Sequence, residues 1–292
     1  MSIVSVVTGA NSGIGRATAI HLAAQGHEVY GTVRDVGRAG KLQAMAAEAK
    51  VEVQLVELDV ADDQSVVAGF AELLDRAGRV DVLVNNAGVG FNATVEDASP
   101  ADILDVMNVN VCGAVRCLKQ VLPGMRERRS GSIVNITSVA GRFGAIAQAP
   151  YVASKWAFEG LSEELAFELA PFGIRVVIIE PGVTKSAIFA KNVDTPASSG
   201  GYDDHYRRLF DFYAAGVAHA TDPFEVGAII FDAVTTDSPK LRYPCSWGGP
   251  EIIAGRAAMA DDEWVALGAI ADDDEYNARF QSALGVDIRP VS

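Results

Sequence analysis

Three side chains between residues 138 and 155 have the types and the spacing needed to move a proton at an alcohol or a carbonyl. Tyr151 and Lys155 are four residues apart, so on a helix they project from the same face, one turn apart. An ammonium group near a phenol favours the phenolate and lowers the tyrosine pKa from about 10 toward the range that a general acid/base needs. Ser138 precedes this pair and could hold the substrate oxygen. The pattern predicts an acid/base site.

A tyrosine followed four residues later by a lysine is a weak pattern by itself. Roughly 0.17 accidental matches are expected in a chain of this composition, and an ordinary amphipathic helix would give the same pattern. The surrounding sequence favours the catalytic interpretation, because Ser138 ends an apolar β-branched run, 132–137, and Pro150 suits the first turn of a helix. We therefore expect a strand that delivers the serine and a helix that carries the tyrosine and the lysine.

The amino-terminal segment predicts a phosphate site. A short β-branched strand, 3–7, is followed by the turn Thr8-Gly-Ala-Asn-Ser-Gly-Ile-Gly15 and then by a helix, 16–25. In this arrangement backbone N–H groups and the helix N-terminus can hold a pyrophosphate. The glycines are spaced Gly-x-x-x-Gly-x-Gly, which differs from the usual dinucleotide fingerprint. A plain tight turn or another phosphate site therefore stays open as an alternative.

The end of the second predicted strand, 28–33, favours NADP over NAD. An NAD site needs a carboxylate there for the ribose 2′-hydroxyl, whereas the 2′-phosphate of NADP needs a cation. The strand is followed by Arg34, and Ser12 of the glycine-rich turn could add a hydrogen bond to the phosphate. Asp35 could serve an NAD ribose if the strand ends later, and Arg34 could be a solvated surface charge. NADP is the prediction and NAD the alternative.

Polar residues also follow the third and fourth predicted strands. The strand 52–58 ends at Asp59, which could accept from the adenine amino group or cap the helix that begins near residue 62. The strand 80–84 runs into Asn85-Asn86-Ala87-Gly88, which suits a loop beside a planar cofactor or an ordinary turn.

A long helix expected over residues 100–125 carries Asn110 in an apolar stretch. A buried amide is costly unless it is paired. We therefore expect Asn110 to have a hydrogen-bonding task, such as holding a water molecule.

Five motifs, taken in this order and at this spacing, resemble the short-chain dehydrogenase/reductase family. They are the glycine-rich turn 8–15, Asn85-Asn-Ala-Gly88, Asn110, Ser138 with Tyr151-Val-Ala-Ser-Lys155, and Pro181-Gly182. The resemblance spans about residues 3–243. It implies an α/β, Rossmann-like, doubly wound fold in which a seven-stranded parallel sheet has helices on both faces. It also implies reversible hydride transfer between a nicotinamide and an alcohol or carbonyl.

The resemblance implies a role for each site residue. Tyr151 becomes the acid/base, Lys155 lowers its pKa and binds the nicotinamide ribose, Ser138 orients the substrate oxygen, and Asn110 holds a water in the proton relay. The loop after the sixth predicted strand, 174–179, should fold over the nicotinamide, and a seventh strand is predicted over 240–243. The residues expected to bind the cofactor are Gly9, Asn11, Ser12, Gly13, Ile14, Gly15, Arg34, Asp59, Val60, Asn85, Ala87, Gly88, Tyr151, Lys155, Pro181, Val183 and Thr184.

The domain organisation follows from the extent of the motifs. We expect one catalytic domain, 1–243, with a substrate lid inserted at about 185–220, and a carboxyl-terminal extension, 244–292, packed on the same domain. Aromatic residues in the lid suit a hydrophobic substrate or ordinary helix packing. The end of the second strand is similar to that of NADP-preferring family members that act on steroids and retinoids. The extension could cover the substrate mouth or a subunit interface, and the resemblance implies a homo-oligomer, either a dimer or a tetramer.

Composition limits the other partners. The formal charge of −14 argues against nucleic acid and anionic membranes, because both require a basic surface. Cys112, Cys117 and Cys245 have no metal-site spacing and form an odd set, which predicts a reduced, cytoplasmic protein without a metal. The sequence has neither a basic amino-terminal region typical of a signal peptide nor a run of about 18 apolar residues that could span a membrane. We therefore expect neither a signal peptide nor a membrane span.

Three classes of function are compared. The set of Asn110, Ser138, Tyr151 and Lys155 favours an NADP-linked oxidoreductase acting on a secondary alcohol or ketone. A cofactor-sensing protein without chemistry would not need the tyrosine and the lysine. A sugar-nucleotide epimerase or dehydratase typically has Thr-Gly-x-x-Gly-x-x-Gly and a larger carboxyl-terminal domain, and this sequence has neither.

Overall fold

A parallel β-sheet forms the centre of the protein. The computed structural model describes residues 2–186, 195–196 and 200–289, and within them seven strands pair in the order β3-β2-β1-β4-β5-β6-β7, every pair parallel. The order reverses between β1 and β4, and ligands of open α/β sheets bind at such a switch point, outside the carboxyl ends of the strands. The expected fold class is confirmed. The strands are β1 (Val4–Val7), β2 (Glu28–Val33), β3 (Gln54–Glu57), β4 (Val82–Asn85), β5 (Gly131–Ile136), β6 (Ile174–Pro181) and β7 (Arg242–Cys245).

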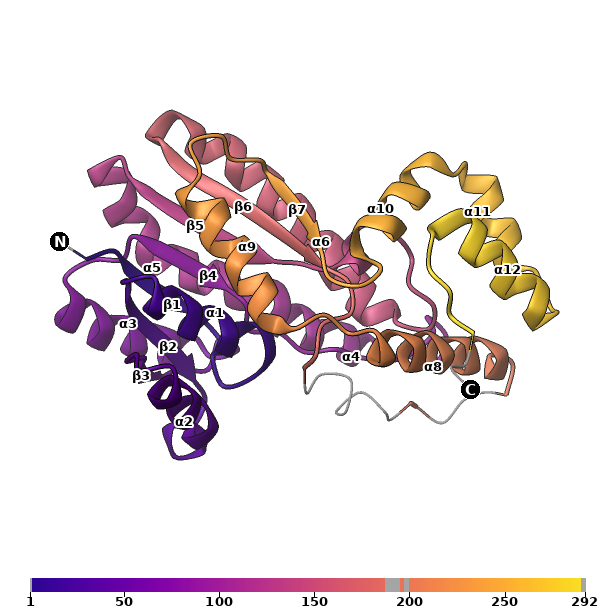
Figure 1. Cartoon of the computed structure of the whole chain (residues 1–292), viewed down its shortest axis with the longest axis horizontal. Helices are drawn as coiled ribbons and strands as arrows, with labels where there is room; N and C mark the ends of the chain where they lie inside the picture. Colours follow the sequence, from indigo (N-terminus) through magenta and orange to yellow (C-terminus); the bar gives the residue numbers. More distant parts are fainter. Residues whose placement is uncertain (1, 187–194, 197–199, 290–292) are drawn as a thin grey trace.

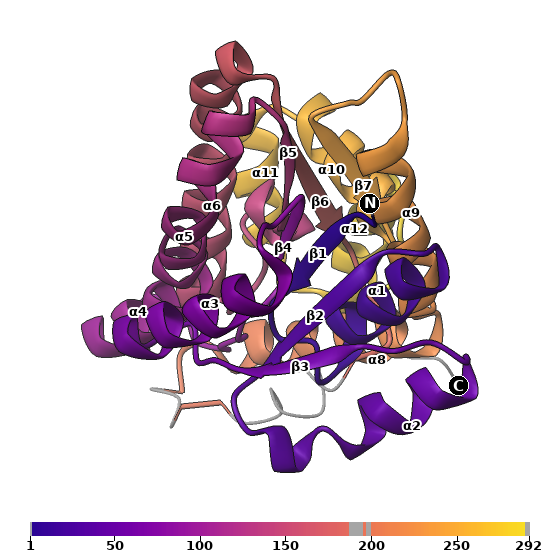
Figure 2. The same ribbon diagram turned by 90° about the vertical axis from the view of Figure 1, so that its left-hand side faces the viewer.

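Helices cover both faces of the sheet, as Figure 2 shows. One face packs against α1 (Gly13–Ala24), α2 (Gly40–Glu48) and α9 (Pro223–Thr235) through a buried aliphatic cluster. The other face packs against α3 (Asp63–Ala77), α5 (Gly113–Arg128) and α6 (Ala149–Leu169) through a second cluster. Burial of both faces explains why the strands are almost continuously apolar rather than alternating. The described part of the chain has no helix that is long and apolar enough to span a membrane.

The long helix expected over residues 100–125 is interrupted at the site. It consists of α4 (Pro100–Met107), a π-helical turn η2 (Asn108–Cys112) and α5. A capping box between Ser99 and Asp102 begins α4. Single π-helical turns inside α-helices are frequent at functional sites, and this one contains Asn110.

β6 and β7 each end two residues later in the sequence than predicted. β6 was expected to end at residue 179 but continues to Pro181, and β7 was expected over 240–243 but lies at Arg242–Cys245. The two differences have one cause, because Glu180 and Pro181 pair with Pro244 and Cys245 and so extend both strands together. Proline is tolerated there because β7 is an edge strand and Pro181 lies at the end of β6.

The carboxyl-terminal helices lie beyond the carboxyl ends of β6 and β7, at the right of Figure 1. They are α10 (Gly249–Ala258), α11 (Asp261–Gly268) and α12 (Asp273–Leu284), and α8 (Asp203–Ala218) lies beside them. Their apolar side chains form a separate buried cluster that includes Val139 and Phe143 from the segment after β5. The helices therefore support the turn that follows Ser138.

Candidate active site

Two turns, one after β1 and one after β4, are held together at the switch point. Thr8 Oγ1 accepts hydrogen bonds from the backbone N–H groups of Asn86, at 2.9 Å, and Ala87, at 3.0 Å, and Asn86 Nδ2 donates to Thr8 O at 2.8 Å. A Cβ on Gly9, where φ is +65°, would lie 2.9 Å from Ala87 Cα, and one on Gly15 would lie 2.3 Å from Asn86 Nδ2. Only glycine allows these two turns to approach so closely.

The N-terminus of α1 is suited to a phosphate. Ser12 occupies the N-cap position without making a side-chain cap hydrogen bond, and no acidic side chain lies in the first turn. The first N–H groups of a helix have no intrahelical partner, and the helix dipole adds positive potential there. Gly13 and Ile14 begin the helix. The Arg16 guanidinium donates a hydrogen bond to Asn11 O, which stabilises the glycine-rich turn. The residues present fit the pyrophosphate of a dinucleotide.

The segment after β2 contains an arginine, Arg34, and an aspartate, Asp35, whose surroundings differ. Arg34 is exposed, and no ion pair or hydrogen bond of its guanidinium occurs among the described residues. Asp35 accepts from Gly37 N at 2.8 Å and forms a 3.2 Å ion pair with Arg38 Nε. Asn11 Nδ2 donates to Arg38 O at 3.2 Å, which links this segment to the glycine-rich turn. Of these two side chains, Asp35 has hydrogen-bond and ion-pair partners and Arg34 has none among the described residues.

Asp59 and Val60 are the residues predicted to lie beside the adenine. Asp59 follows β3 and its carboxylate accepts from Ala61 N at 2.9 Å, whereas the cap of α3 is Asp62, which accepts from Ser65 N at 2.7 Å. Val60 is buried, and a Cβ on Gly113 would lie 2.9 Å from its Cβ. These residues lie at the carboxyl end of β3, as a role beside adenine requires.

Asn85 and Gly88 differ in what they can offer to a cofactor. The Asn85 side chain donates to Asn135 Oδ1 at 2.9 Å, which joins β4 to β5 inside the sheet. Gly88 lies where a Cβ would be 3.2 Å from Asn110 Oδ1. The Asn85 amide nitrogen is therefore engaged between the strands, and the predicted cofactor contacts of Asn85, Ala87 and Gly88 stay predictions.

Asn110 makes three hydrogen bonds that join separate elements. Its Oδ1 accepts from Val89 N at 2.8 Å, and its Nδ2 donates to Val89 O and to Ser154 Oγ, both at 2.9 Å. Ser154 Oγ in turn donates to Tyr151 O at 2.7 Å. Asn110 thus ties the loop after β4 to the first turns of α6. Its predicted role in holding a water stays a prediction.

Ser138 lies at the carboxyl end of β5 and Tyr151 in the first turns of α6, with Pro150 at the helix start as expected. Ser138 is buried and begins a short 3₁₀ turn, η3 (Val139–Gly141), where its Oγ accepts from Ala140 N at 3.2 Å and donates to Pro181 O at 3.5 Å. Lys155 Nζ donates to Ile136 O at 3.0 Å and lies 5.6 Å from the centre of the Tyr151 ring. The structure brings these three side chains together.

Burial, rather than the neighbouring charge, sets the direction of the Tyr151 pKa. Burial raises the pKa of Tyr151 above its ordinary value, and a hydrogen bond with the Ser138 side chain partly opposes this. Burial also lowers the pKa of Lys155 to about 8, with the Glu159 charge acting in the opposite direction. The direction for Tyr151 is opposite to the one that the Tyr-x-x-x-Lys spacing predicted. The reason is that desolvation of the buried phenol is the largest influence on its pKa.

The loop after β6 is fixed by the end of β7. Gly182 N donates to Cys245 O at 2.8 Å and Val183 N to Trp247 O at 2.9 Å, and Thr184 Oγ1 lies 2.7 Å from Ser246 Oγ. A Cβ on Gly182 would lie 2.1 Å from Trp247 O. Pro181, at the start of this loop, lies beside Ser138, because its carbonyl oxygen accepts from Ser138 Oγ at 3.5 Å, and the contacts of Val183 and Thr184 with the cofactor stay predictions. Of the predicted lid, 185–220, residues 187–194 and 197–199 lie outside the described residues.

Three polar residues beside Tyr151 were not predicted as site residues. Gln148 Nε2 and Tyr213 OH share a hydrogen bond, and Tyr213 OH donates to Asn92 Oδ1 at 2.8 Å, with all three side chains buried. Tyr213 lies close enough to Tyr151 for the two phenols to influence each other's ionisation. Tyr213 belonged to the aromatic group in the lid, whereas nothing in the sequence distinguished Asn92.

A cavity of about 500 Å³ adjoins this group. Its lining is mainly apolar and comes from the segment 144–149, from α8 and from the carboxyl-terminal helices, including Trp264, Leu267 and Tyr276. His205 of α8 also lines it, and the buried Nδ1 of this histidine has no hydrogen-bond partner in the described part of the chain. Pockets of this size and polarity are typical of sites for small organic molecules.

Comparisons with known proteins agree with this geometry. The family described as short chain dehydrogenase matches residues 3–197. The "Uncharacterized oxidoreductase YusZ" of Bacillus subtilis is 35% identical, with 90% of this chain and 96% of that protein aligned. The mouse "17-beta-hydroxysteroid dehydrogenase type 1" is 38% identical over 82% of this chain and 72% of its own, and bovine "Retinol dehydrogenase 8" is 37% identical over 81% and 79%.

Solved structures show the same fold. A short-chain dehydrogenase from Streptomyces avermitilis superimposes with a TM-score of 0.77 at 34% identity, covering 92% of this chain and 98% of the other. A metagenomic short-chain oxidoreductase in complex with NADP has a TM-score of 0.67 at 28% identity, covering 83% and 96%. The motifs, the fold and these matches lead to one conclusion: the chain is an oxidoreductase that belongs to the short-chain dehydrogenase/reductase family.

Proposed function

We propose that this enzyme transfers hydride between NADP and a secondary alcohol or ketone, and that its substrate is hydrophobic, of a steroid-, retinoid- or lipid-like kind. The observation that carries the catalytic part is the convergence of Ser138, Tyr151 and Lys155 at the carboxyl end of β5. A cofactor sensor without chemistry has no use for these three side chains.

The proton chemistry follows from the burial of the phenol. Because the pKa of Tyr151 lies above its ordinary value, the phenol is protonated at neutral pH and can act as a general acid toward a carbonyl oxygen. Ser138 offers a second hydroxyl to the same oxygen. Bound NADPH would supply the hydride. In the reverse direction Tyr151 would accept the proton of the alcohol.

The choice of NADP is supported by Arg34. Its guanidinium is exposed and unengaged among the described residues, whereas Asp35 is already occupied by Gly37 N and Arg38. A guanidinium can bind a phosphate through two parallel hydrogen bonds. The metagenomic relative that was solved with NADP agrees with this choice. An NAD-linked alcohol dehydrogenase of the same family is the alternative, and it would use Asp35 instead.

The hydrophobic substrate is supported by the cavity next to Gln148. Its mainly apolar walls would exclude water from the reaction and favour substrates with a large hydrocarbon part. The names of the mouse and bovine relatives, a hydroxysteroid dehydrogenase and a retinol dehydrogenase, point to the same class. The residues 185–220 would act as the lid, and the predicted homo-oligomer stays a prediction.

A comparison of substrates tests this proposal. Purified enzyme should oxidise NADPH with apolar cyclic or long-chain ketones and should have a lower kcat/KM with short polar ketones and with NADH. Each added methylene that enters the cavity should improve kcat/KM several-fold, in line with about 0.8 kcal/mol per buried CH₂. Equal rates with short polar ketones would contradict the substrate class, and faster turnover with NADH would contradict the cofactor.

A further inference from the structure

We propose that Glu159 is a positioning residue that keeps Lys155 charged for proton transfer at Tyr151. Glu159 does not touch the reacting atoms and acts through the lysine. This inference rests on the proposed function, because it gives Glu159 a part in the same proton transfer.

One face of α6 contacts the end of β5 through three side chains. Tyr151, Lys155 and Glu159 lie at successive four-residue steps on α6, so they share one face of the helix. Each of the three side chains contacts one residue of the segment 136–138, at the end of β5 and just beyond it. The Ser138 side chain interacts with Tyr151, Ile136 O accepts from Lys155 Nζ, and Thr137 Oγ1 donates to Glu159 Oε1.

Close packing holds this arrangement. Gly141 closes the 3₁₀ turn after Ser138, and a Cβ there would lie 2.8 Å from Glu159 Cγ and 2.9 Å from Lys155 O. Lys155 is 6% exposed and Glu159 is 5% exposed. Two buried side chains of opposite charge, one turn apart on the same helix, interact much more strongly than the same pair would in water.

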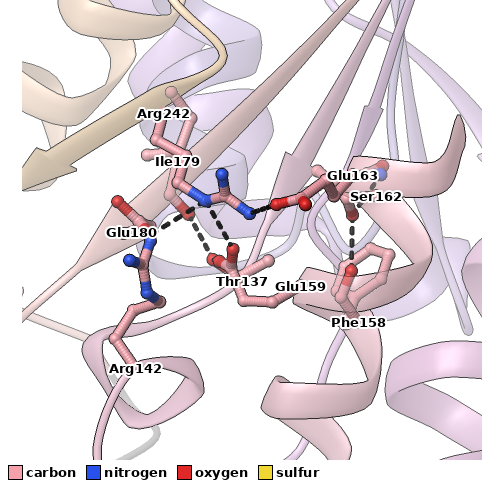
Figure 3. Close-up of polar contacts among 10 residues, drawn as sticks. Thr137, Arg142, Phe158, Glu159, Ser162, Glu163, Ile179, Glu180 and Arg242 are labelled. Atoms are coloured by element: carbon pink, nitrogen blue, oxygen red, sulfur yellow. Dashed lines mark hydrogen bonds and ion pairs between the residues drawn. The ribbon is translucent and has the colours of Figure 1, made fainter. Parts of the chain in front are cut away.

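Glu159 also belongs to a cluster of charged side chains. Figure 3 shows Arg242 of β7 among three carboxylates. Arg242 Nε lies 3.0 Å from Glu159 Oε2 and 3.7 Å from Glu180 Oε1, while Arg242 Nη2 binds Glu163. Arg142 Nη1 binds Glu180 Oε1 at 2.8 Å, from the segment after η3.

This cluster has two guanidinium groups and three carboxylates, and Glu159 is the member whose charge acts on Lys155. Lys155 and Glu159 come from α6, as does the exposed Glu163, while Glu180 comes from β6, Arg242 from β7 and Arg142 from the segment after η3. Glu180 is fully buried. Removing the Glu159 charge would leave the buried Lys155 ammonium without the carboxylate that acts on it. Such an arrangement favours the neutral amine.

The direction of the effect on the pKa agrees with the geometry. Burial lowers the pKa of Lys155 to about 8, and Glu159 is the charge that raises it. A neutral glutamine in place of Glu159 would remove that support and shift the Lys155 pKa further down. Because Tyr151 titrates at higher pH, the loss of ketone-reducing activity near pH 8 would report Lys155 first.

The experiment is the pH profile of NADPH-dependent ketone reduction, from pH 6 to 10, in four variants. The alkaline limb is the part of the profile in which kcat falls as the pH rises. In Glu159→Gln this limb should lie about 1 pH unit lower than in the wild type, which corresponds to roughly threefold lower kcat at pH 7.5. Glu159→Asp keeps the charge and should keep a limb close to that of the wild type. Arg242→Gln removes a cation from the cluster and should move the limb upward. Glu163→Gln removes a carboxylate from the same arginine at the surface and is the matched control, with an unchanged limb.

A purely structural role predicts a different outcome. If Glu159 only ties α6 to β7, then Glu159→Gln and Glu159→Asp both disturb that link, and either no limb moves or both move equally. Either result overturns the proposal. If Glu159→Gln does not fold, Arg242→Gln decides alone, and an unmoved limb in that variant overturns it.

Thermal unfolding gives a second test that needs no substrate. Below about pH 8 Lys155 is charged and benefits from Glu159, whereas neutral Lys155 does not. The difference in Tm between wild type and Glu159→Gln should therefore be largest below about pH 7 and should narrow as the pH rises through about 8. A difference that stays constant to pH 10 overturns the proposal. Absence of turnover in the wild type with every ketone would instead contradict the proposed function and leave the unfolding test decisive for Glu159.

Discussion

Replacing Arg34 with alanine tests the cofactor assignment at the residue that carries it. Arg34 is exposed at the end of β2, and its guanidinium has no ion pair or hydrogen bond among the described residues. It therefore loses no protein partner when it binds a phosphate, and its removal leaves no buried group unsatisfied. We expect Arg34→Ala to fold with wild-type stability and to lose affinity for NADPH only.

The size of the loss can be worked out from the exposure of the side chain. A hydrogen bond to a charged group contributes about 1.5–3 kcal/mol, and solvent screening at an exposed site favours the lower half of this range. A loss of about 1.4–2 kcal/mol corresponds to a tenfold to thirtyfold weaker Kd for NADPH. Because the contribution is electrostatic at a solvent-exposed position, the difference should shrink as salt is raised from 0.05 M to about 0.5 M.

The assay is a fluorescence titration of the purified protein with NADPH and with NADH. Arg38→Ala is the matched control, because it removes an equal charge four residues further along the chain. The guanidinium of Arg38 already forms an ion pair with Asp35, at 3.2 Å. We expect the Kd for NADH to be unchanged in Arg34→Ala and the Arg38→Ala variant to lose clearly less NADPH affinity. Equal losses for NADPH and NADH in Arg34→Ala, or preference of the wild type for NADH, would refute the reasoning and return Asp35 to the ribose.

Three further substitutions test the scaffold of the site. Gly15→Ala should abolish measurable NADPH binding in the same titration, because the new Cβ would lie 2.3 Å from Asn86 Nδ2; binding within threefold of wild type would contradict this. Asn110→Ala should lower the free energy of unfolding by about 1–3 kcal/mol, measured by urea denaturation, because Val89 N and O lose their partner; an unchanged midpoint would count against it. Phe280→Ala should cost about 3–5 kcal/mol, because this ring is 1% exposed in the cluster that supports Val139; a cost below about 1 kcal/mol would show that the carboxyl-terminal helices are loosely attached.

The parts of the site that the sequence could predict are those set by local rules. Pro150 opens α6, and four-residue spacing then places Tyr151 and Lys155 on one face. The β-branched run before Ser138 is a buried strand. These features depend on neighbours within a few residues, so periodicity and turn chemistry were sufficient. The strand order and the seven-stranded sheet came from the resemblance, because local patterns do not specify which strands pair.

The parts that escaped prediction depend on contacts between distant segments. Glu159 and Arg242 are 83 residues apart and Asn92 and Tyr213 are 121 apart, so no spacing rule could connect them. The direction of the Tyr151 pKa could not be predicted for a related reason. Spacing shows that an ammonium is near, whereas the desolvation of the phenol depends on the segments that cover it.

The most direct test of the central claim is turnover of Tyr151→Phe. Purified wild type and variant would be compared for NADPH-dependent ketone reduction, with NADPH affinity measured on the same samples. We expect kcat to fall at least a hundredfold while the Kd for NADPH changes less than about threefold, because only the hydroxyl that transfers the proton is removed. Turnover near the wild-type rate, with the cofactor bound normally, would contradict the assignment of Tyr151 as the general acid.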